Sequence, residues 1–212
     1  MIIIIRRRII NKKYILKQPD DYKLCRRCGK ESETIQHTTA ACKQLAATEC
    51  VNRHAGLAQA VHHKLAEAAE LIEDKSAYYK CTPAGVLENG NYKLCCNRSV
   101  LTDKTVPFNG PDITFMDNKT KNTILTDTAA PNTHNVAKTT TDKQNKYQEL
   151  TKEICAVWKQ KAAQVIPIPI PSTAAIPKPL SHSLTTHNLH PSTYIQLQKS
   201  VILGTCSVVR NF

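Results

Sequence analysis

The sequence predicts an α/β protein in which a small cysteine- and histidine-rich module and a long helix precede a core that contains a β-hairpin. Three observations support this fold class. Four residues have the spacing of metal ligands, Cys25-x2-Cys28-x8-His37-x4-Cys42. An Ala-rich segment then repeats apolar residues at helical spacing. Further along the chain, two β-branched segments flank a polar turn, which is the pattern of a hairpin.

The composition is that of a basic globular protein. Its 212 residues suffice for one full domain plus a small module, and 41% of them are hydrophobic, an ordinary share. Lys and Arg outnumber Asp and Glu by 29 to 17, which gives a net charge of +12 and a pI near 9.3. This charge favours a polyanionic partner, above all nucleic acid, although many small basic proteins have no such partner.

The cysteines and the first residues predict the compartment. Nine cysteines, an odd number without regular spacing, argue against a secreted disulfide scaffold. In Met1–Ile10 a basic run follows a short apolar run, which is the wrong order and length for a signal peptide or a membrane span. Arg6–Arg8 with Lys12 and Lys13 form either a nuclear import patch or a solvated surface. We therefore expect a nuclear or intracellular protein without a membrane segment.

Changes in composition divide the chain into four segments. Residues 1–24 form a basic leader that starts abruptly, as if it belonged to a larger upstream region. Residues 25–45 hold the cysteine and histidine ligands, and residues 46–75 form a helical connector. One long helix is expected from Lys43 to about Glu73, with a break near its single glycine. Residues 76–212 form the core domain.

The first part of the core predicts a β-hairpin. Asp74–Pro107 contains several turn signals, among them Asn89–Asn91, and is expected to form loops with short strands. Ile113–Met116 and Thr123–Thr126 are β-branched, and the polar segment Asp117–Asn122 joins them as a turn.

The second part predicts a helix and a weak strand. Val136–Lys161 has the apolar stripe of an amphipathic helix that packs on the sheet. Gln164–Ile170 is β-branched again, but its alternate prolines restrict it to an edge strand or an extended arm. From Pro177 the chain is expected to be irregular until Tyr194–Val209, a short helix or strand.

The predicted hairpin brings two acids together. If its turn is centred between Lys119 and Thr120, facing residues have numbers that sum to 239, and Asp112 then faces Asp127. Facing residues have Cβ atoms about 4.5–5.5 Å apart, close enough for both carboxylates to share a divalent cation. Two like charges at this distance repel each other, and a bound Mg²⁺ would remove the repulsion.

Such a pair suits phosphodiester hydrolysis. The reaction needs a metal ion that activates water and a cation near the scissile phosphate. Lys143 or Lys146, one helical turn apart, would supply the cation, and the adjacent Tyr147 would orient the phosphate. The alternative is that Asp112 only forms a turn after Pro111 and that the lysines form a solvated face.

The cysteine and histidine spacing predicts a structural zinc site. Cys25 and Cys28 would chelate the ion from one turn, and His37 and Cys42 would complete a tetrahedral site. Zinc would supply folding energy to a module too small to bury a core. The alternative is a set of unrelated cysteines. Backbone phosphates are the expected contact of the neighbouring basic residues, which include Arg26 and Arg27.

The other histidines are candidates for chemistry near neutral pH. His62 and His63 are expected to be solvent-exposed on the Ala-rich helix. No role is assigned to those near the start of this helix or in the tail, which are His54, His182, His187 and His190.

The order of the motifs resembles the C-terminal end of insect-type non-LTR retrotransposon polyproteins, the elements with a restriction-enzyme-like endonuclease. The resemblance extends from about Lys13 to Phe212. It rests on the zinc knuckle followed by Val86–Leu94, Gly110-Pro-Asp112, Leu125-Thr-Asp127 and Lys143-Gln-Asn-Lys146-Tyr147.

The resemblance implies a restriction-endonuclease-like core of the PD-(D/E)xK kind that nicks target DNA, so that a reverse transcriptase in the same polyprotein can prime on the freed 3′ end. Asp112 and Asp127 match the metal-binding acids, and Lys143 and Lys146 match the region of the catalytic lysine. Glu88 loosely matches an additional acid. The implied cofactors are structural Zn²⁺ and catalytic Mg²⁺ or Mn²⁺, and the implied partners are target DNA and, as an option, element RNA.

Several positions depart from the family pattern. Gly110 replaces a basic residue, and Cys95-Cys96 replaces an aromatic pair. Polar or small residues replace apolar ones around Asp127, and prolines interrupt a strand. No polymerase motif is present in the sequence. The chain is therefore interpreted as a truncated and decayed copy, either still a nuclease, or a non-catalytic zinc-dependent nucleic-acid-binding protein, or an unfolded product. The oligomeric state stays open.

Overall fold

The computed structural model describes residues 24–73, 76–80 and 82–212, so the predictions for the basic leader lie outside the described residues except at residue 24. The described chain is mixed α/β, as the sequence predicts. Its main sheet has five strands in the order β1-β2-β3-β4-β6. The bounds of these strands are Val86–Glu88, Tyr92–Cys96, Ile113–Asp117, Asn122–Thr126 and Ala162–Val165.

The β3–β4 hairpin has the predicted register. Ile113 pairs with Thr126 and Asp117 with Asn122 in antiparallel fashion, so the numbers of paired residues sum to 239. The turn closes at this place because Asp117 Oδ1 accepts the backbone N–H groups of the two residues that follow Asn118, at 2.8 and 3.1 Å. Asp112 directly precedes β3 and Asp127 directly follows β4.

The edge of the sheet next to β4 is parallel. β6 pairs with β4 in parallel and ends the sheet. The predicted edge strand Gln164–Ile170 is therefore confirmed in part, because β6 begins earlier, at Ala162, and ends at Val165. Beyond it, β7 (Ile168–Pro169) pairs in parallel with β5 (Thr128–Ala129) as a separate two-stranded sheet. This short second sheet holds the segment that immediately follows Asp127.

The connector helix differs from its prediction. It comprises α2 (Lys43–Leu45), a π-helical turn at Ala46–Cys50, and α3 (Val51–Ala68). The expected break near Gly56 is wrong, because α3 runs through this residue, and the helix ends at Ala68, before the expected Glu73. Glu70, with a φ of 53°, turns the chain away from the helix axis.

A second long helix packs along the first. α7 (Thr193–Arg210) has 18 residues, longer than the short helix or strand expected there. Close packing explains its glycine, since a Cβ atom on Gly204 would lie 2.5 Å from Arg53 Cγ. α6 (Leu180–Thr186) lies in the part of the tail that was expected to be irregular, so that expectation is wrong.

The predicted helix after the hairpin is two helices. α4 (Val136–Lys146) and α5 (Gln148–Val157) meet at Tyr147, whose φ of −110° and ψ of 13° interrupt the helix. The side chain of Tyr147 is 1% exposed and joins the apolar cluster around Leu150 and Ile154. The interruption therefore lets a buried ring anchor both helices. Short 3₁₀ helices cover Tyr78–Lys80 and Thr133–Asn135, and a π-helical turn covers His37–Ala41.

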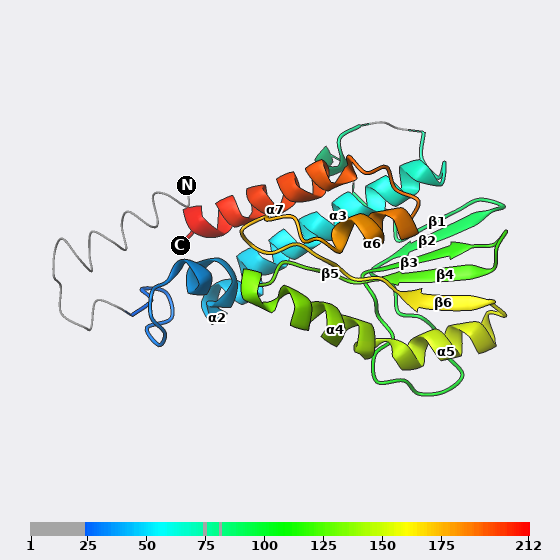
Figure 1. The fold of residues 1–212 in the computed structure, drawn as a ribbon, viewed down its shortest axis with the longest axis horizontal. Coiled ribbons are helices and arrows are strands. Elements are labelled where there is room, and N and C mark those ends of the chain that lie inside the picture. Colours follow the sequence, from blue (N-terminus) through cyan, green and yellow to red (C-terminus); the bar gives the residue numbers. More distant parts are fainter. Residues whose placement is uncertain (1–23, 74–75, 81) are drawn as a thin grey trace.

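Two apolar clusters hold the sheet. The larger packs Leu94 and Ile113 of the sheet against α3, α6 and α7, and the smaller packs Leu125 and Val165 against α5. In Figure 1 the α3–α7 pair and α5 accordingly flank the sheet from different sides. Within the described residues, no helix has both the length and the apolar character that a membrane crossing requires.

Candidate functional site

The four predicted zinc ligands come together in the structure. An isolated bridge between Leu24 and Ser32 closes the first loop, and Gly29 provides its left-handed φ of 64°. Cys25 Sγ lies 3.8 Å from Cys42 Sγ, and Cys28 Sγ lies 3.3 Å from His37 Nε2. All four ligand atoms lie within 4.8 Å of one another.

These distances fit a tetrahedral zinc ion. With Zn–S bonds of about 2.3 Å and Zn–N bonds of about 2.0–2.1 Å, tetrahedral angles place two sulfurs about 3.8 Å apart and a sulfur and a nitrogen about 3.6 Å apart. Backbone N–H groups of Lys30 and Glu31 lower the pKa of Cys28 to about 6, toward the thiolate that binds metal, whereas burial raises the pKa of Cys25. The cluster could therefore form a zinc site.

The arginines of the module are engaged within the protein. Arg26 pairs with Glu33 and lies over the ring of Phe212, 4.8 Å from its centroid. Arg27 donates a hydrogen bond to the carbonyl oxygen of Asn211. These contacts fix the module to the end of α7, and phosphate contact by either guanidinium stays a prediction.

A buried arginine connects the module to the core. Arg53 on α3 is 3% exposed. It donates to the carbonyl oxygen of Thr39 at 2.6 Å, to Thr205 Oγ1 at 3.1 Å and to the carbonyl oxygen of Ala130 at 3.3 Å. One side chain therefore joins the turn that holds His37, the helix α7 and the chain that follows Asp127.

The predicted acid pair also comes together, and with it His54, a histidine to which the sequence assigns no role. Asp112, Asp127 and His54 each offer a ligand atom within 4.8 Å of the other two. His54 lies on α3, far from both acids in sequence, so no local spacing indicates it. Glu88 is not part of this cluster, since it lies on β1 and pairs with Lys93 at 2.8 Å.

Asp112 is held by neighbours that favour its charged form. Its Oδ2 accepts the backbone N–H and the hydroxyl of Thr128, both at 2.7 Å, and lies 3.1 Å from His54 Nε2. Burial raises the pKa of Asp112, but the hydrogen bonds and charge of His54 and Thr128 lower it by more, to about 2. The hydrogen bond to Asp112 in turn raises the pKa of His54.

Asp127 faces the two predicted lysines. It is 2% exposed, and its Oδ1 lies 2.5 Å from Lys143 Nζ. Lys146 Nζ lies 3.6 Å from Oδ2, which is too long for a hydrogen bond. Oδ2 is buried and has no hydrogen-bond partner among the described residues. This oxygen is therefore available to a cation.

Tyr147 lies behind the lysines. Its buried hydroxyl donates to the carbonyl oxygen of Gly110 at 2.9 Å and accepts from Lys146 Nζ at 2.8 Å. Burial, followed by the charge of Asp127, raises the pKa of the phenol. Tyr147 thus holds Lys146 near the turn before Asp112. Because its hydroxyl is already bonded on both sides, the predicted effect of Tyr147 on a phosphate would be indirect, through the position of Lys146.

Two other histidines contradict the sequence prediction. His62 and His63 were expected on the solvent face of the helix but are 4% and 6% exposed. Burial, with a smaller contribution from His63, lowers the pKa of His62 to about 4, and His63 lies 3.0 Å from Glu67. The Ala-rich helix is buried on more than one face, because α7 and the sheet both pack against it.

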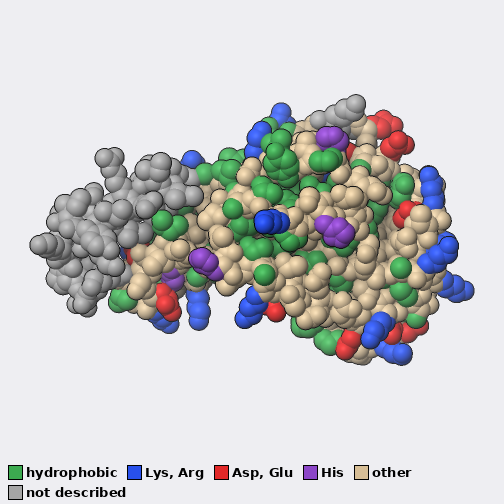
Figure 2. All heavy atoms as spheres, viewed as in Figure 1, with side chains coloured by type: hydrophobic (Ala, Val, Ile, Leu, Met, Phe, Trp, Pro, Cys, Tyr) green, Lys and Arg blue, Asp and Glu red, His purple; other side chains and the backbone are tan. Residues whose placement is uncertain are grey.

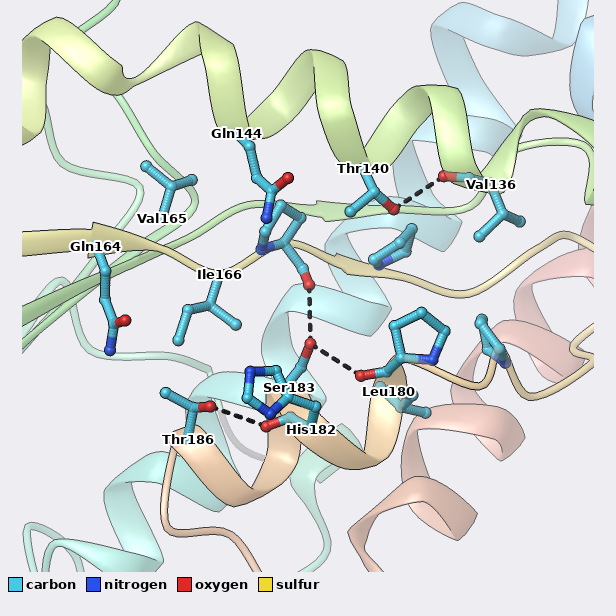
Figure 3. Close-up of a pocket in the computed structure, with 14 residues that line it drawn as sticks. Val136, Thr140, Gln144, Gln164, Val165, Ile166, Leu180, His182, Ser183 and Thr186 are labelled. Atoms are coloured by element: carbon cyan, nitrogen blue, oxygen red, sulfur yellow. Dashed lines mark hydrogen bonds between the residues drawn. The ribbon is translucent and has the colours of Figure 1, made fainter.

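A pocket of about 240 Å³ adjoins the helix that carries the lysines (Figure 3). Val136, Thr140 and Gln144 line it from α4, and Ile166 and Ser183 face them. No lysine, arginine or acid lines this pocket. The lining of this pocket therefore offers no cationic side chain to a phosphate.

Surface charge is distributed unevenly (Figure 2). Basic side chains gather at the end of the sheet that holds the β3–β4 turn, where Lys119 and Lys121 are exposed, and apolar ones gather over α7, where Ile202 and Leu203 are exposed.

Comparison with protein-family models found no match to this chain, and comparison with curated proteins found none either.

Proposed function

We propose that the chain is a divalent-metal-dependent DNA endonuclease that makes single-strand nicks, with a PD-(D/E)xK core and a structural zinc module. In this proposal it is a piece of a non-LTR retrotransposon polyprotein. The observation that carries the proposal is the convergence of Asp112, Asp127 and Lys143, whose charged atoms meet at the open end of one hairpin.

The residues fit a catalytic Mg²⁺ or Mn²⁺. Asp112 and Asp127 would hold the ion, and the buried unpartnered oxygen of Asp127 supplies a lone pair that no described residue uses. When bound, such an ion neutralises charge on the phosphoryl oxygens and lowers the pKa of water. Thr128 fixes the orientation of the Asp112 carboxylate through two hydrogen bonds to its Oδ2.

Lys143 and Lys146 would act on the phosphate and not on the metal ion. Lys143 pairs with Asp127, and in this proposal its ammonium would turn to the scissile phosphate when substrate binds. Lys146, held by Tyr147, offers a second donor on the same side of α4. Both would donate to phosphate oxygens and stabilise their developing charge. DNA backbone contact, the expected mode of binding, agrees with the net charge of +12.

The test is nicking of supercoiled plasmid by the purified protein in Mg²⁺ or Mn²⁺. We expect open-circular product, and we expect Asp112→Ala and Asp127→Ala to remove it. Asp142→Ala is the matched control, because this acid is exposed on α4 one position before Lys143. Nicking that survives in both site variants would refute the proposal.

A second candidate is a non-catalytic, zinc-dependent nucleic-acid-binding protein. The observation that favours it is the ion pair between Lys143 and Asp127, which neutralises that acid without any metal. DNA binding in a gel-shift assay, together with no nicking in either metal, would select this function.

A further inference from the structure

His54 belongs to the acid cluster but comes from a different part of the fold than either acid. It is the fourth residue of α3, a helix of 18 residues whose inner face is buried against the sheet and α7. Its neighbour Arg53 fixes this end of the helix through three hydrogen bonds. The imidazole is therefore carried by a rigid element, as a precise ligand must be.

The position of the ring fits a ligand as well as an ion-pair partner. Two ligands at right angles around an ion, each about 2.1 Å from it, lie about 3 Å apart. His54 Nε2 and Asp112 Oδ2 are separated by 3.1 Å. Asp127 supplies the third ligand atom of the cluster, and its Oδ2 is buried without a hydrogen-bond partner among the described residues. The three groups thus face one position.

The mixture of donors discriminates among metals. Mg²⁺ takes oxygen ligands and keeps much of its water, whereas an imidazole nitrogen suits first-row transition metals. Mn²⁺ shares the preference of Mg²⁺ for carboxylate oxygens but, as a first-row transition metal, accepts an imidazole nitrogen more readily than Mg²⁺ does. One nitrogen beside two carboxylates should therefore shift preference from Mg²⁺ toward Mn²⁺.

We propose that His54 is a nitrogen ligand of this site and that it makes the site selective for Mn²⁺ over Mg²⁺. The inference rests on the proposed function for the presence of a metal between Asp112 and Asp127. It adds a third ligand and names the class of metal.

The test must distinguish a metal ligand from a hydrogen-bond donor that only positions Asp112. His54 Nε2 also lies 3.0 Å from the carbonyl oxygen of Thr128, so in the metal-free protein it acts as a hydrogen-bond donor between two acceptors. Binding of a metal at Nε2 would therefore require this proton to leave the ring or the ring to take the tautomer that is protonated at Nδ1. A donor alone would position Asp112 without touching a metal. His54→Gln separates the two roles, because its amide retains a hydrogen-bond donor near Nε2 while it removes the nitrogen ligand and can offer a metal only a carbonyl oxygen.

The first measurement is metal affinity in the full chain with its zinc retained. Mn²⁺ binding is followed by the paramagnetic resonance signal of free Mn²⁺, and Mg²⁺ binding by competition. We expect Mn²⁺ to bind at least about ten-fold more tightly than Mg²⁺, and His54→Gln to weaken Mn²⁺ by about ten-fold or more while changing Mg²⁺ by less than about three-fold. His134→Gln, which changes an exposed histidine outside the cluster, should alter neither affinity.

The second measurement needs no variant at His54 and therefore does not depend on how such a variant folds. Pulsed paramagnetic resonance of Mn²⁺ bound to the wild-type protein should show coupling to an imidazole nitrogen, and the signal should vanish in Asp127→Asn. Absence of this coupling, or an unchanged Mn²⁺/Mg²⁺ ratio in His54→Gln, overturns the inference. If the wild-type protein still nicks plasmid in that case, the proposed function stands without it. A wild-type protein that binds neither metal overturns both.

Discussion

The two clusters of candidate metal ligands are built in different ways. The four residues of the cysteine–histidine cluster lie within one short segment, Cys25 to Cys42, which folds as a loop and a π-helical turn. The acid cluster takes His54 from a helix, Asp112 and Asp127 from the ends of two strands, and Lys143 from a later helix. We therefore expect the structure of the first cluster to depend on a bound ion, whereas the second cluster depends on the fold.

The largest expected effect follows from this contrast. Cys42→Ser should remove zinc and unfold residues 25–45, because structural zinc contributes about 10–16 kcal/mol to small zinc modules. Omission of Mg²⁺ and Mn²⁺ should leave the hairpin around the acids folded. Zinc content and amide hydrogen exchange check both statements.

The control is Cys155→Ser, which changes a free cysteine outside the cluster and should keep full zinc content. If Cys42→Ser retained exchange protection throughout residues 25–45, the proposed dependence of the module on its ion would be wrong.

Arg53 tests whether the two clusters are energetically independent, because its hydrogen bonds join the segments that hold them. Arg53→Ala leaves three acceptors without their donor, on the turn of the module, on α7 and after Asp127. Each unsatisfied buried group costs about 1–3 kcal/mol, so we expect a loss of about 3 kcal/mol or more in the free energy of unfolding. Urea unfolding monitored by Trp158 fluorescence measures it.

Arg98→Ala is the matched control, because Arg98 makes no ion pair among the described residues and lies beside a surface pocket. A loss in Arg53→Ala no larger than in Arg98→Ala would show that the module and the core are energetically independent.

A third effect, of similar size, concerns a buried histidine that supports the strand before Asp127. His187 on the loop after α6 is 2% exposed, and its Nε2 lies 3.0 Å from Thr126 Oγ1, at the end of the strand before Asp127. Burial lowers its pKa to about 4. The folded protein therefore keeps this ring neutral, while the unfolded chain binds a proton below about pH 6.5.

This difference in pKa makes the free energy of unfolding depend on pH. The stability contributed by neutral His187 is complete above about pH 6.5 and is lost as pH falls toward 4, by up to about 3 kcal/mol. Urea unfolding at pH 7.5, 6 and 5 should show this loss, and His187→Leu should reduce its slope. His182→Leu, a change at an exposed histidine on α6, should keep the wild-type slope. Equal slopes in all three proteins would exclude His187 as the cause.

The extent to which sequence predicts each cluster follows from the range of the interactions. Cys25 to Cys42 could be identified from spacing alone because their geometry is local. The pairing of Asp112 with Asp127 could also be predicted, because the turn that begins at Asp117 fixes the register of the hairpin. In both cases a short stretch of chain determines which side chains meet.

The remainder needed tertiary information. His54 reaches Asp112 only because α3 packs beside the open end of the hairpin, and no spacing in the sequence encodes that packing. The burial of His62 and His63 likewise depends on a later segment of the chain, since Tyr78, Thr82 and Leu87 line a pocket together with both side chains. The interruption at Tyr147 arises because its ring enters the apolar cluster, an outcome that helical periodicity does not describe.

The smallest expected effect concerns Gly110, where the resembling family has a basic residue before Pro-Asp. Its backbone does not have the positive φ that would require glycine, and a Cβ atom would meet only Ser99 Oγ, at 3.9 Å. Gly110→Lys should therefore leave the free energy of unfolding within about 0.5 kcal/mol. An ammonium one residue from the Pro111-Asp112 turn should add a phosphate contact, and about 1 kcal/mol of such binding corresponds to an increase of about five-fold in DNA affinity.

Gel-shift titration against Gly90→Lys, a glycine in the β1–β2 turn with equal space for a side chain, distinguishes a contact at the site from a general increase in charge. Equal gains in both variants would mean that position 110 does not face DNA, and the acid cluster would then lose its most direct link to a nucleic-acid substrate.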